Sequence, residues 1–380
     1  MNNTARITLT SFLAYFSMSS MLAPIGLVSA PMAAHFGIDV TQATEAFGAL
    51  TTGILIGAVL ALFVLDRAPL RALFCGLYAS FTIALIIMSH GAELPTVRVC
   101  LAVIGIASGL GLPAAALTIT ATYNDAQRSS MLVMTDGAFS VAGFIMPLLT
   151  LSLIARGYLW STIYIVAACI TLLLILLAVF SRFPTPERDA TSTDPRQWPA
   201  SVWLIIGALF LYTLGQYAMT WWLPNHLTTS YDAAPQIAGK VVERFWQGMF
   251  IAQLLVAWWV LSAGTMRVLR IGAVTGMLGT FPLWLVTDAG TVGWLALLWG
   301  VANLGLLKMM LSFATQQIPT PSARLVSFIL LGATCGTAVS PFVSSAIVAN
   351  AGTIAVLWFA SGCYVAMSAL ILIATRRSTA

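Results

Sequence analysis

The sequence predicts an all-α membrane protein in which twelve transmembrane helices form two pseudo-symmetric halves of six. Hydrophobic residues make up 59% of the 380 residues and charged residues only 8%, whereas soluble domains carry about 25% charged residues. Apolar stretches long enough to cross a bilayer, which takes about 20 residues, follow one another from Thr8 to Thr375. Their uninterrupted length favours helices over barrel strands, because lipid offers the backbone no hydrogen-bond partners.

These apolar stretches predict the helices in order. The twelve spans are residues 7–34, 44–65, 71–89, 96–122, 130–155, 159–181, 201–224, 239–262, 267–287, 291–316, 325–349 and 353–375. The first stretch is too long for the core of a signal peptide, so we expect it to remain as the first helix. The longest connection, from Arg182 to Ala200, is polar and rich in Pro, Thr and Asp, which is typical of a linker. It divides the chain into an N-terminal half (1–182), a cytoplasmic linker (183–200) and a C-terminal half (201–380).

Basic residues predict the orientation of the helices. Of the 17 Lys and Arg residues, twelve fall on the side of the N-terminus, four fall on the opposite side, and Lys308 lies inside a span. Positive charge gathers on the cytoplasmic side of a membrane protein. We therefore expect a multi-pass protein of the bacterial inner membrane with both termini in the cytoplasm.

The two halves repeat each other at a spacing of about 195 residues. Four matched pairs show this spacing: Arg71 with Arg267, Gly105 with Gly300, Gly137 with Gly332 and Pro147 with Pro341. Two repeats in the same membrane orientation are typical of transporters, which bind their substrate near the middle of the bilayer. The repeat therefore favours a transporter.

The connection between the second and third spans resembles a signature of the major facilitator superfamily, G-x-x-x-D-R-x-G-R-[KR]. Asp66 and Arg67 match its acid–base pair and Arg71 its final basic position, whereas both glycines and the other basic position are replaced. The resemblance covers almost the whole chain and implies the two-halved, twelve-helix major facilitator fold. It also implies that Asp66, Arg67 and Arg71 form an inner gate, in which the acid meets a helix N-terminus.

Four segments resemble a narrower branch of that superfamily, the TsgA-like transporters, which are related to the fucose permease group. These segments are residues 135–143, 215–216, 245–246 and 316–328. The branch implies a class of mechanism and no particular substrate. The fucose permease group places carboxylates for proton coupling in its first and fourth helices, and the corresponding spans here contain no acid. That coupling mechanism therefore does not carry over.

Lys308 lies at least eight residues from either end of the predicted tenth span. A lysine at such depth costs about 2.5–3.5 kcal/mol even on low estimates. The helical period places Ser312 on the same face, one turn further on. We interpret Lys308 and Ser312 as substrate-binding residues, with the lysine holding an anionic group. The alternative is a lysine that pairs with Asp136 or extends to the cytoplasmic edge.

Asp136 is the one acid that falls clearly inside a predicted span, about seven residues into the fifth. Burial favours the protonated form of a carboxyl group, which makes Asp136 the candidate for proton coupling. The alternative is a structural gate in which Asp136 bonds to a basic residue on the same side of the membrane, Arg71, Arg128 or Arg324.

Polar stripes on the first and seventh spans supply further substrate-binding candidates, because hydroxyl, amide and aromatic groups together suit a small-molecule site. These candidates are Tyr15, Ser19, Tyr212, Gln216 and Thr220. The alternative is ordinary hydrogen bonding between helices. Glu243 and Arg244 lie near the outer end of the eighth span, where they form either an outer gate or a solvated helix end.

We expect a secondary active transporter that moves a small organic solute, anionic or zwitterionic, by alternating access with proton coupling. The alternatives are a neutral sugar–proton symporter and a membrane sensor that keeps the fold without transporting. The expected partners are the solute, a proton and the bilayer, and we expect a monomer. The basic residues are dispersed, which argues against a nucleic-acid partner. The sequence holds no nucleotide-binding loop, metal-ligand cluster or nucleophile motif, so neither an enzyme nor a cofactor is expected.

Overall fold

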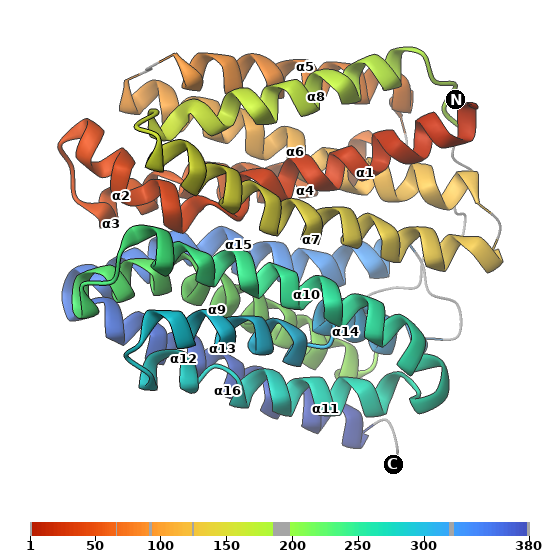
Figure 1. Cartoon of the computed structure of the whole chain (residues 1–380). Coiled ribbons are helices and arrows are strands. Elements are labelled where there is room, and N and C mark those ends of the chain that lie inside the picture. Colours follow the sequence, from red (N-terminus) through yellow and green to blue (C-terminus); the bar gives the residue numbers. More distant parts are fainter. Residues whose placement is uncertain are drawn as a thin grey trace. The chain divides into compact units, whose positions relative to one another are not determined.

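The computed structural model is built from helices (Figure 1). It describes residues 2–65, 67–90, 93–123, 125–184, 198–318 and 323–377, without a few side chains inside the helices. These ranges contain no strand. The contacts divide the chain into two units, Met1–Arg188 and Asp189–Ala380. The predicted linker at 183–200 falls mostly outside the described residues, so its exact limits stay a prediction.

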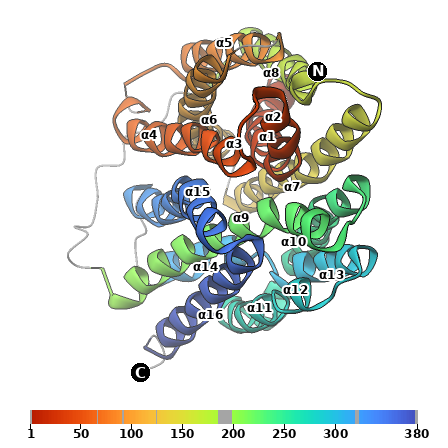
Figure 2. The ribbon, with the colours of Figure 1, turned by 90° about the vertical axis from the view of Figure 1, so that its left-hand side faces the viewer.

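The described residues of the N-terminal unit form nine helical elements. They are α1 (Asn3–Leu22), α2 (Ile25–Phe36), α3 (Val40–Ala46), α4 (Gly48–Val64), α5 (Leu70–Ser89), α6 (Leu94–Thr122), α7 (Asp125–Ala155), η1 (Trp160–Thr162) and α8 (Ile163–Val179). The α1 helix packs against α6, α7 and α8, while α4 packs against α6 and α5 against α8 (Figure 2). The first predicted span is bent by 50° between α1 and α2. The bend falls at Pro24, which has no backbone N–H for the helix ladder.

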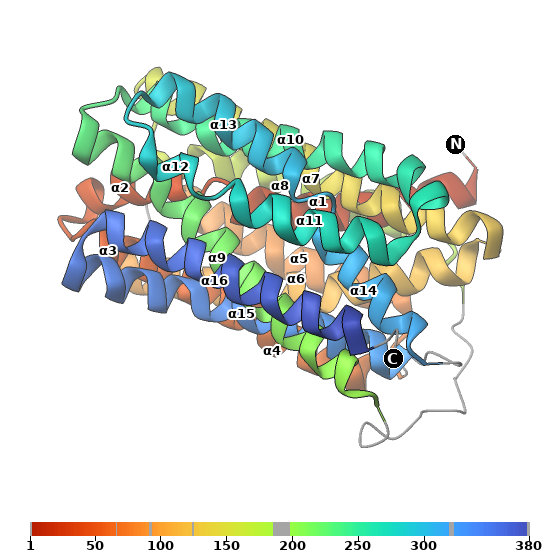
Figure 3. The same ribbon diagram turned by 90° about the horizontal axis from the view of Figure 1, so that it is seen from below.

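The C-terminal unit repeats this pairing of helices (Figure 3). Its elements are α9 (Ala200–Tyr231), α10 (Pro235–Ala263), α11 (Thr265–Leu278), α12 (Pro282–Leu285), α13 (Ala289–Ala302), α14 (Leu306–Gln316), α15 (Ala323–Ala351) and α16 (Thr353–Arg377). The α9 helix packs against α15 and α16, as α1 packs against α7 and α8. Likewise, α10 packs against α13 and α11 against α16, as α4 packs against α6 and α5 against α8.

The predicted all-helical membrane fold is confirmed. Among the described residues, 10 helices are long and apolar enough to cross a membrane, or 11 if the bent pair α1–α2 counts as one span. The α10 helix lies where the eighth span is predicted but is not among these ten, so the number twelve stays a prediction. The ninth predicted span is interrupted between α11 and α12, and the tenth between α13 and α14.

Glycine pairs explain the close packing at the same place in each unit. Gly53 on α4 faces Gly105 on α6, and Gly248 on α10 faces Gly300 on α13. A Cβ atom at any of these four positions would press against backbone atoms of the facing helix. Small residues let membrane helices approach at backbone distance. The matched spacing of Gly105 and Gly300 therefore has a packing reason.

Candidate functional site

The span formed by α13 and α14, Ala289–Gln316, is broken in its interior at residues 303–305. Leu304 has φ 45° and Gly305 has φ 60°, which is the left-handed region that ends a right-handed helix. Glycine adopts this conformation readily, whereas a residue such as leucine loses about 1–2 kcal/mol in it. Contacts with neighbouring helices must therefore hold the break in place.

Asn303 supplies one set of these contacts. Its side chain is completely buried. Its Nδ2 donates to the Trp299 carbonyl at 2.7 Å, and its Oδ1 accepts a hydrogen bond from the Tyr364 hydroxyl on α16 at 3.0 Å. Both ends of the amide are therefore used where the helix is interrupted.

Two reciprocal bonds join the break to α11. In an unbroken helix the Ala302 carbonyl would accept from the backbone N–H of Leu306, which here bonds to the Asn303 carbonyl instead. The Thr275 hydroxyl takes its place and donates to the Ala302 carbonyl at 2.7 Å. In return, Trp299 Nε1 donates to the Gly276 carbonyl at 3.1 Å. The side chains thus satisfy carbonyl groups that lipid would leave unpaired.

Thr275→Val is expected to destabilise the protein. Valine keeps the shape of threonine but leaves the carbonyl of the half-buried Ala302 without its donor, at a cost of about 1–3 kcal/mol. Thermal unfolding of the purified protein in detergent measures the loss. The matched control is Thr334→Val, because the hydroxyl of the half-buried Thr334 donates to the Leu330 carbonyl of its own helix. Equal midpoints for the two variants would contradict the role of Thr275 at the break.

Two glycines on α11 make room for the broken segment. A Cβ at Gly272 would lie 3.2 Å from the Leu304 Cβ, and a Cβ at Gly276 would lie 3.3 Å from Leu306 Cδ1. Gly76 occupies the corresponding place in the first half, and a Cβ there would have no atom within 4 Å. Its unit also has an unbroken α6 in place of α13 and α14. The break packed against glycines is therefore a feature of the C-terminal unit.

Aromatic rings surround the same place. The Tyr364 ring lies 5.8 Å from the Tyr212 ring and 5.6 Å from the Trp299 ring, measured between centroids. The Trp299 ring in turn lies 4.4 Å from the Phe245 ring. These separations are typical of interacting aromatic pairs. Tyr212, one of the predicted binding residues, is therefore linked through Tyr364 to the break.

The other predicted binding residues of the C-terminal unit lie on α9 and α14. Gln216 and Thr220 are buried, and the Thr220 hydroxyl donates to the Gln216 carbonyl at 2.9 Å. Lys308 is half-buried in the first turn of α14, where its backbone N–H bonds to the Gly305 carbonyl at 3.0 Å. Ser312 accepts a hydrogen bond from Gln316 at 3.1 Å. A helix N-terminus carries a partial positive charge, so α14 and Lys308 bring positive charge to one place.

In the N-terminal unit, Tyr15 and Ser19 lie one turn apart on α1, half-buried and buried respectively. The Ser19 hydroxyl has no hydrogen-bond partner within the described part of the chain. Asp136 is half-buried on α7, which packs against α1. Within this unit the binding and coupling candidates thus lie on neighbouring helices.

The predicted gating residues are placed only in part. Asp66 lies outside the described residues, while Arg67 and Arg71 are exposed at the connection of α4 and α5. Glu243 accepts a hydrogen bond from Gln247 at 2.9 Å. Arg244 donates to the Gly290 carbonyl at 3.3 Å and lies 3.9 Å from the centroid of the Trp294 ring. These contacts fall within the C-terminal unit, and the two gates stay predictions.

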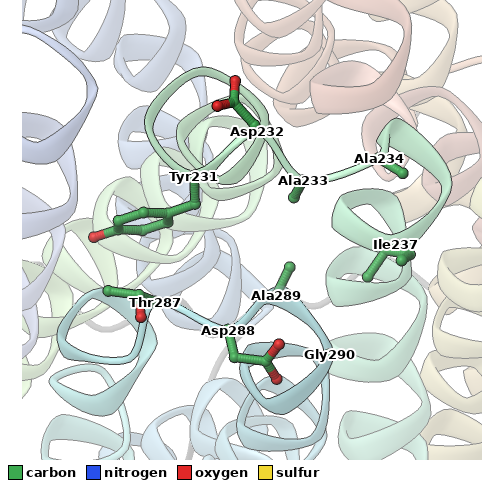
Figure 4. A pocket seen from close by; sticks show the side chains of 9 residues that line it. All are labelled: Tyr231, Asp232, Ala233, Ala234, Ile237, Thr287, Asp288, Ala289 and Gly290. Carbon is green, nitrogen blue, oxygen red and sulfur yellow. The ribbon is translucent and has the colours of Figure 1, made fainter.

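A separate hollow of about 370 Å³ lies where the connections of α9 with α10 and of α12 with α13 meet (Figure 4). Asp232 and Asp288 line it. Asp288 accepts hydrogen bonds from the hydroxyl and the backbone N–H of Thr291, at 2.6 and 2.7 Å. These bonds hold the pKa of Asp288 below its usual value, and the bond from the Thr291 hydroxyl has the larger effect. The hollow contains none of the predicted site residues, and Asp288 there caps the start of α13.

Sequence reasoning missed the residues that hold the break: Thr275, Trp299, Asn303 and Tyr364. One local signal was present, because Asn303 and Gly305 stand two positions apart inside an apolar stretch. Both residue types favour turns and left-handed backbone, so the pair indicates an interruption. Thr275 and Tyr364 are distant in sequence and carry no such signal.

The chain matches known proteins over almost its full length. The TsgA homologue of Serratia proteamaculans (strain 568) is 28% identical over 380 residues, which cover 98% of this chain and 95% of that protein. The TsgA homologue of Yersinia pestis (strain Pestoides F) is 29% identical over 388 residues, with coverages of 98% and 96%. These relatives confirm the predicted TsgA-like resemblance.

Solved structures share the fold. A crystal structure of the nucleoside transporter NupG has a TM-score of 0.74 at 15% identity, covering 98% of this chain and 100% of that chain. A crystal structure of a D-xylose-proton symporter has a TM-score of 0.73 at 15% identity, with coverages of 97% and 96%. The family model described as Major Facilitator Superfamily matches residues 7–324. The chain therefore belongs to the major facilitator superfamily.

Proposed function

We propose that this membrane transporter moves a small anionic or zwitterionic organic solute across the bacterial inner membrane by alternating access, coupled to protons. Lys308 carries the proposal. It is half-buried beyond a break inside a membrane span, in the first turn of α14. A cation at such a place is costly and typically serves a substrate or ion pathway. Together with the positive end of α14 it suits a carboxylate or another anionic group.

Further polar groups would complete the binding of the solute. On the C-terminal unit these are Tyr212, Gln216, Thr220 and Ser312, and on the N-terminal unit they are Tyr15 and Ser19. Hydroxyl, amide and aromatic groups fix the orientation of a small molecule in a largely apolar site. Four of them are buried, and Tyr15 on α1 and Ser312 on α14 are half-buried, which supports this assignment.

Asp136 is the proposed proton-coupling residue, because it is a half-buried acid within a candidate span, Met134–Ala155, whereas Glu45, in the span Val40–Val64, is exposed. One structural neighbour is a D-xylose-proton symporter, which supports proton coupling in this fold. Asp66, Arg67 and Arg71 are the proposed inner gate, and Glu243 and Arg244 the proposed outer gate. The protein would act as a monomer with both termini in the cytoplasm.

A ligand screen by thermal unfolding tests the role of Lys308. Panels of carboxylates, metal chelates and neutral sugars are added to the purified protein in detergent. A ligand at about 100 times its Kd stabilises the folded state by about 2.7 kcal/mol. An anion is expected to raise the unfolding midpoint of the wild type and to leave that of Lys308→Gln unchanged. The matched control is Lys240→Gln, which removes an exposed lysine of α10 and should respond as the wild type does.

Equal stabilisation of Lys308→Gln and the wild type by the same anion would refute the role of Lys308. A second candidate, a neutral sugar or nucleoside symporter, is favoured by the two structural neighbours, a nucleoside transporter and a D-xylose-proton symporter. It is also favoured by the aromatic pair Tyr217 and Trp221 on α9, whose ring centroids lie 4.9 Å apart. A sugar that stabilises all three proteins would select this candidate. Flux of the selected compound into liposomes then separates either transporter from a non-transporting sensor.

A further inference from the structure

We propose that Asn303 and Tyr364 are positioning residues, whose hydrogen bond determines where α14 begins and hence where Lys308 is held. The inference rests on the proposed function, in which Lys308 binds the substrate. Neither residue needs to touch the substrate for this role. Both act through the backbone of the broken span.

Where α14 begins depends on the backbone at residues 303–305, which either forms the break or continues the helix. Lys308 lies three residues after Gly305, the last residue of the break. Its backbone N–H donates to the Gly305 carbonyl and so forms the first turn of α14. A shift of α14 by one residue in register would turn each of its residues by about 100° around the helix axis. The Lys308 side chain would then point in a different direction. The position of the break is therefore a property that binding by Lys308 requires.

The left-handed backbone at Leu304 destabilises the break, because a residue with a side chain disfavours this conformation. Asn303 stabilises the break. Its side-chain amide donates a hydrogen bond to the Trp299 carbonyl on α13 and accepts one from the Tyr364 hydroxyl on α16. The bond from α16 is thus the one that fixes Asn303 against a second helix.

Tyr364 is suited to this role by its surroundings. The residue is completely buried, and its ring lies between Tyr212 on α9 and Trp299 on α13. Gly276 on α11 lies beside the ring, since a Cβ there would be in ordinary van der Waals contact with Tyr364 Cε1, at 3.7 Å. The ring is packed on these sides whether or not the hydroxyl is present. Tyr364→Phe therefore removes the hydrogen bond and retains the packing.

The chain has two lysines, Lys308 and the exposed Lys240, which provides a test that needs no substrate. The full-length protein in detergent is treated briefly with sulfo-N-hydroxysuccinimide acetate, and the acetylation rate of each lysine is measured by mass spectrometry. Lys308 is half-buried, and the exposed Lys240 serves as the internal reference. Losing one neutral hydrogen bond changes the equilibrium between the two backbone arrangements about fivefold, so we expect Tyr364→Phe to raise the ratio of the Lys308 rate to the Lys240 rate by up to that factor.

Asn303→Ala removes both bonds of the amide and is expected to raise the ratio further. The matched control is Tyr164→Phe, because Tyr164 is equally buried and its hydroxyl has no hydrogen-bond partner within the described part of the chain. It should leave the ratio at the wild-type value. The thermal unfolding midpoint of each variant is measured as well, because a general loosening of the fold lowers that midpoint, and this separates positioning from instability.

A wild-type ratio in Tyr364→Phe would overturn the inference. If only Asn303→Ala purifies as a single species, a wild-type ratio in that variant would overturn it. This result is independent of the ligand screen. If Lys308→Gln keeps its response to anions while Tyr364→Phe raises the labelling ratio, the binding role of Lys308 fails and the positioning of its side chain stands. If the ligand response depends on Lys308 and the ratio is unchanged, the proposed function stands and the positioning role fails.

Discussion

Gly300→Ala is expected to destabilise the protein by about 3 kcal/mol or more, the upper part of the range for overpacking a core. The added Cβ would press against the Phe245 carbonyl and would lie 2.9 Å from the Met249 nitrogen and 3.0 Å from the Gly248 Cα. These are backbone atoms of α10, so no side-chain rotation relieves the contact. The helix itself must move away from α13. The fraction of monodisperse protein and the thermal unfolding midpoint measure the effect.

The matched control is Gly362→Ala. Gly362 lies inside α16, and a Cβ there would have no atom within 4 Å. Alanine favours a helix over glycine by about 0.5–1 kcal/mol, so this variant should be at least as stable as the wild type. The same chemical change is therefore expected to have opposite signs at the two positions. Equal stability of both variants would disprove the close contact of α10 and α13.

The sequence predicted the helices well because lipid demands an apolar stretch for each span. It predicted the repeat from the spacing of Gly105 and Gly300, but not why glycine stands there. The reason is a contact between backbones of helices that lie far apart in sequence. The interruptions were missed for a related reason. Both sides of the break at residues 303–305 are apolar, so the stretch looks continuous.

The candidate site was predictable where a residue is anomalous by itself. Lys308 stands out because a charge inside a span is costly. Thr275 and Tyr364 do not stand out, because hydroxyl-bearing and aromatic residues are common in packed membrane helices. Their importance comes from partners that are distant along the chain: Thr275 meets Ala302, 27 residues away, and Tyr364 meets Asn303, 61 residues away. A single sequence does not reveal such pairings.

Asp136→Asn is expected to abolish uphill accumulation of the solute while preserving its exchange. Asparagine has the shape of aspartate but cannot take up or release the coupling proton. A pH difference of one unit stores about 1.4 kcal/mol per proton, enough for about tenfold accumulation by a one-to-one symporter. In liposomes with such a gradient, the compound selected by the ligand screen should accumulate in the wild type and only equilibrate in Asp136→Asn. Exchange of labelled for unlabelled compound should continue in both.

The control is Glu45→Gln, which removes an exposed carboxylate of α3 and should accumulate the solute normally. Exchange without accumulation requires that substrate binding and conformational change survive, so it isolates the proton step. Normal accumulation by Asp136→Asn would exclude Asp136 from coupling. Loss of both exchange and accumulation would point to the other interpretation, in which Asp136 is a structural gate. The two measurements on one variant therefore separate the alternatives that the sequence leaves open.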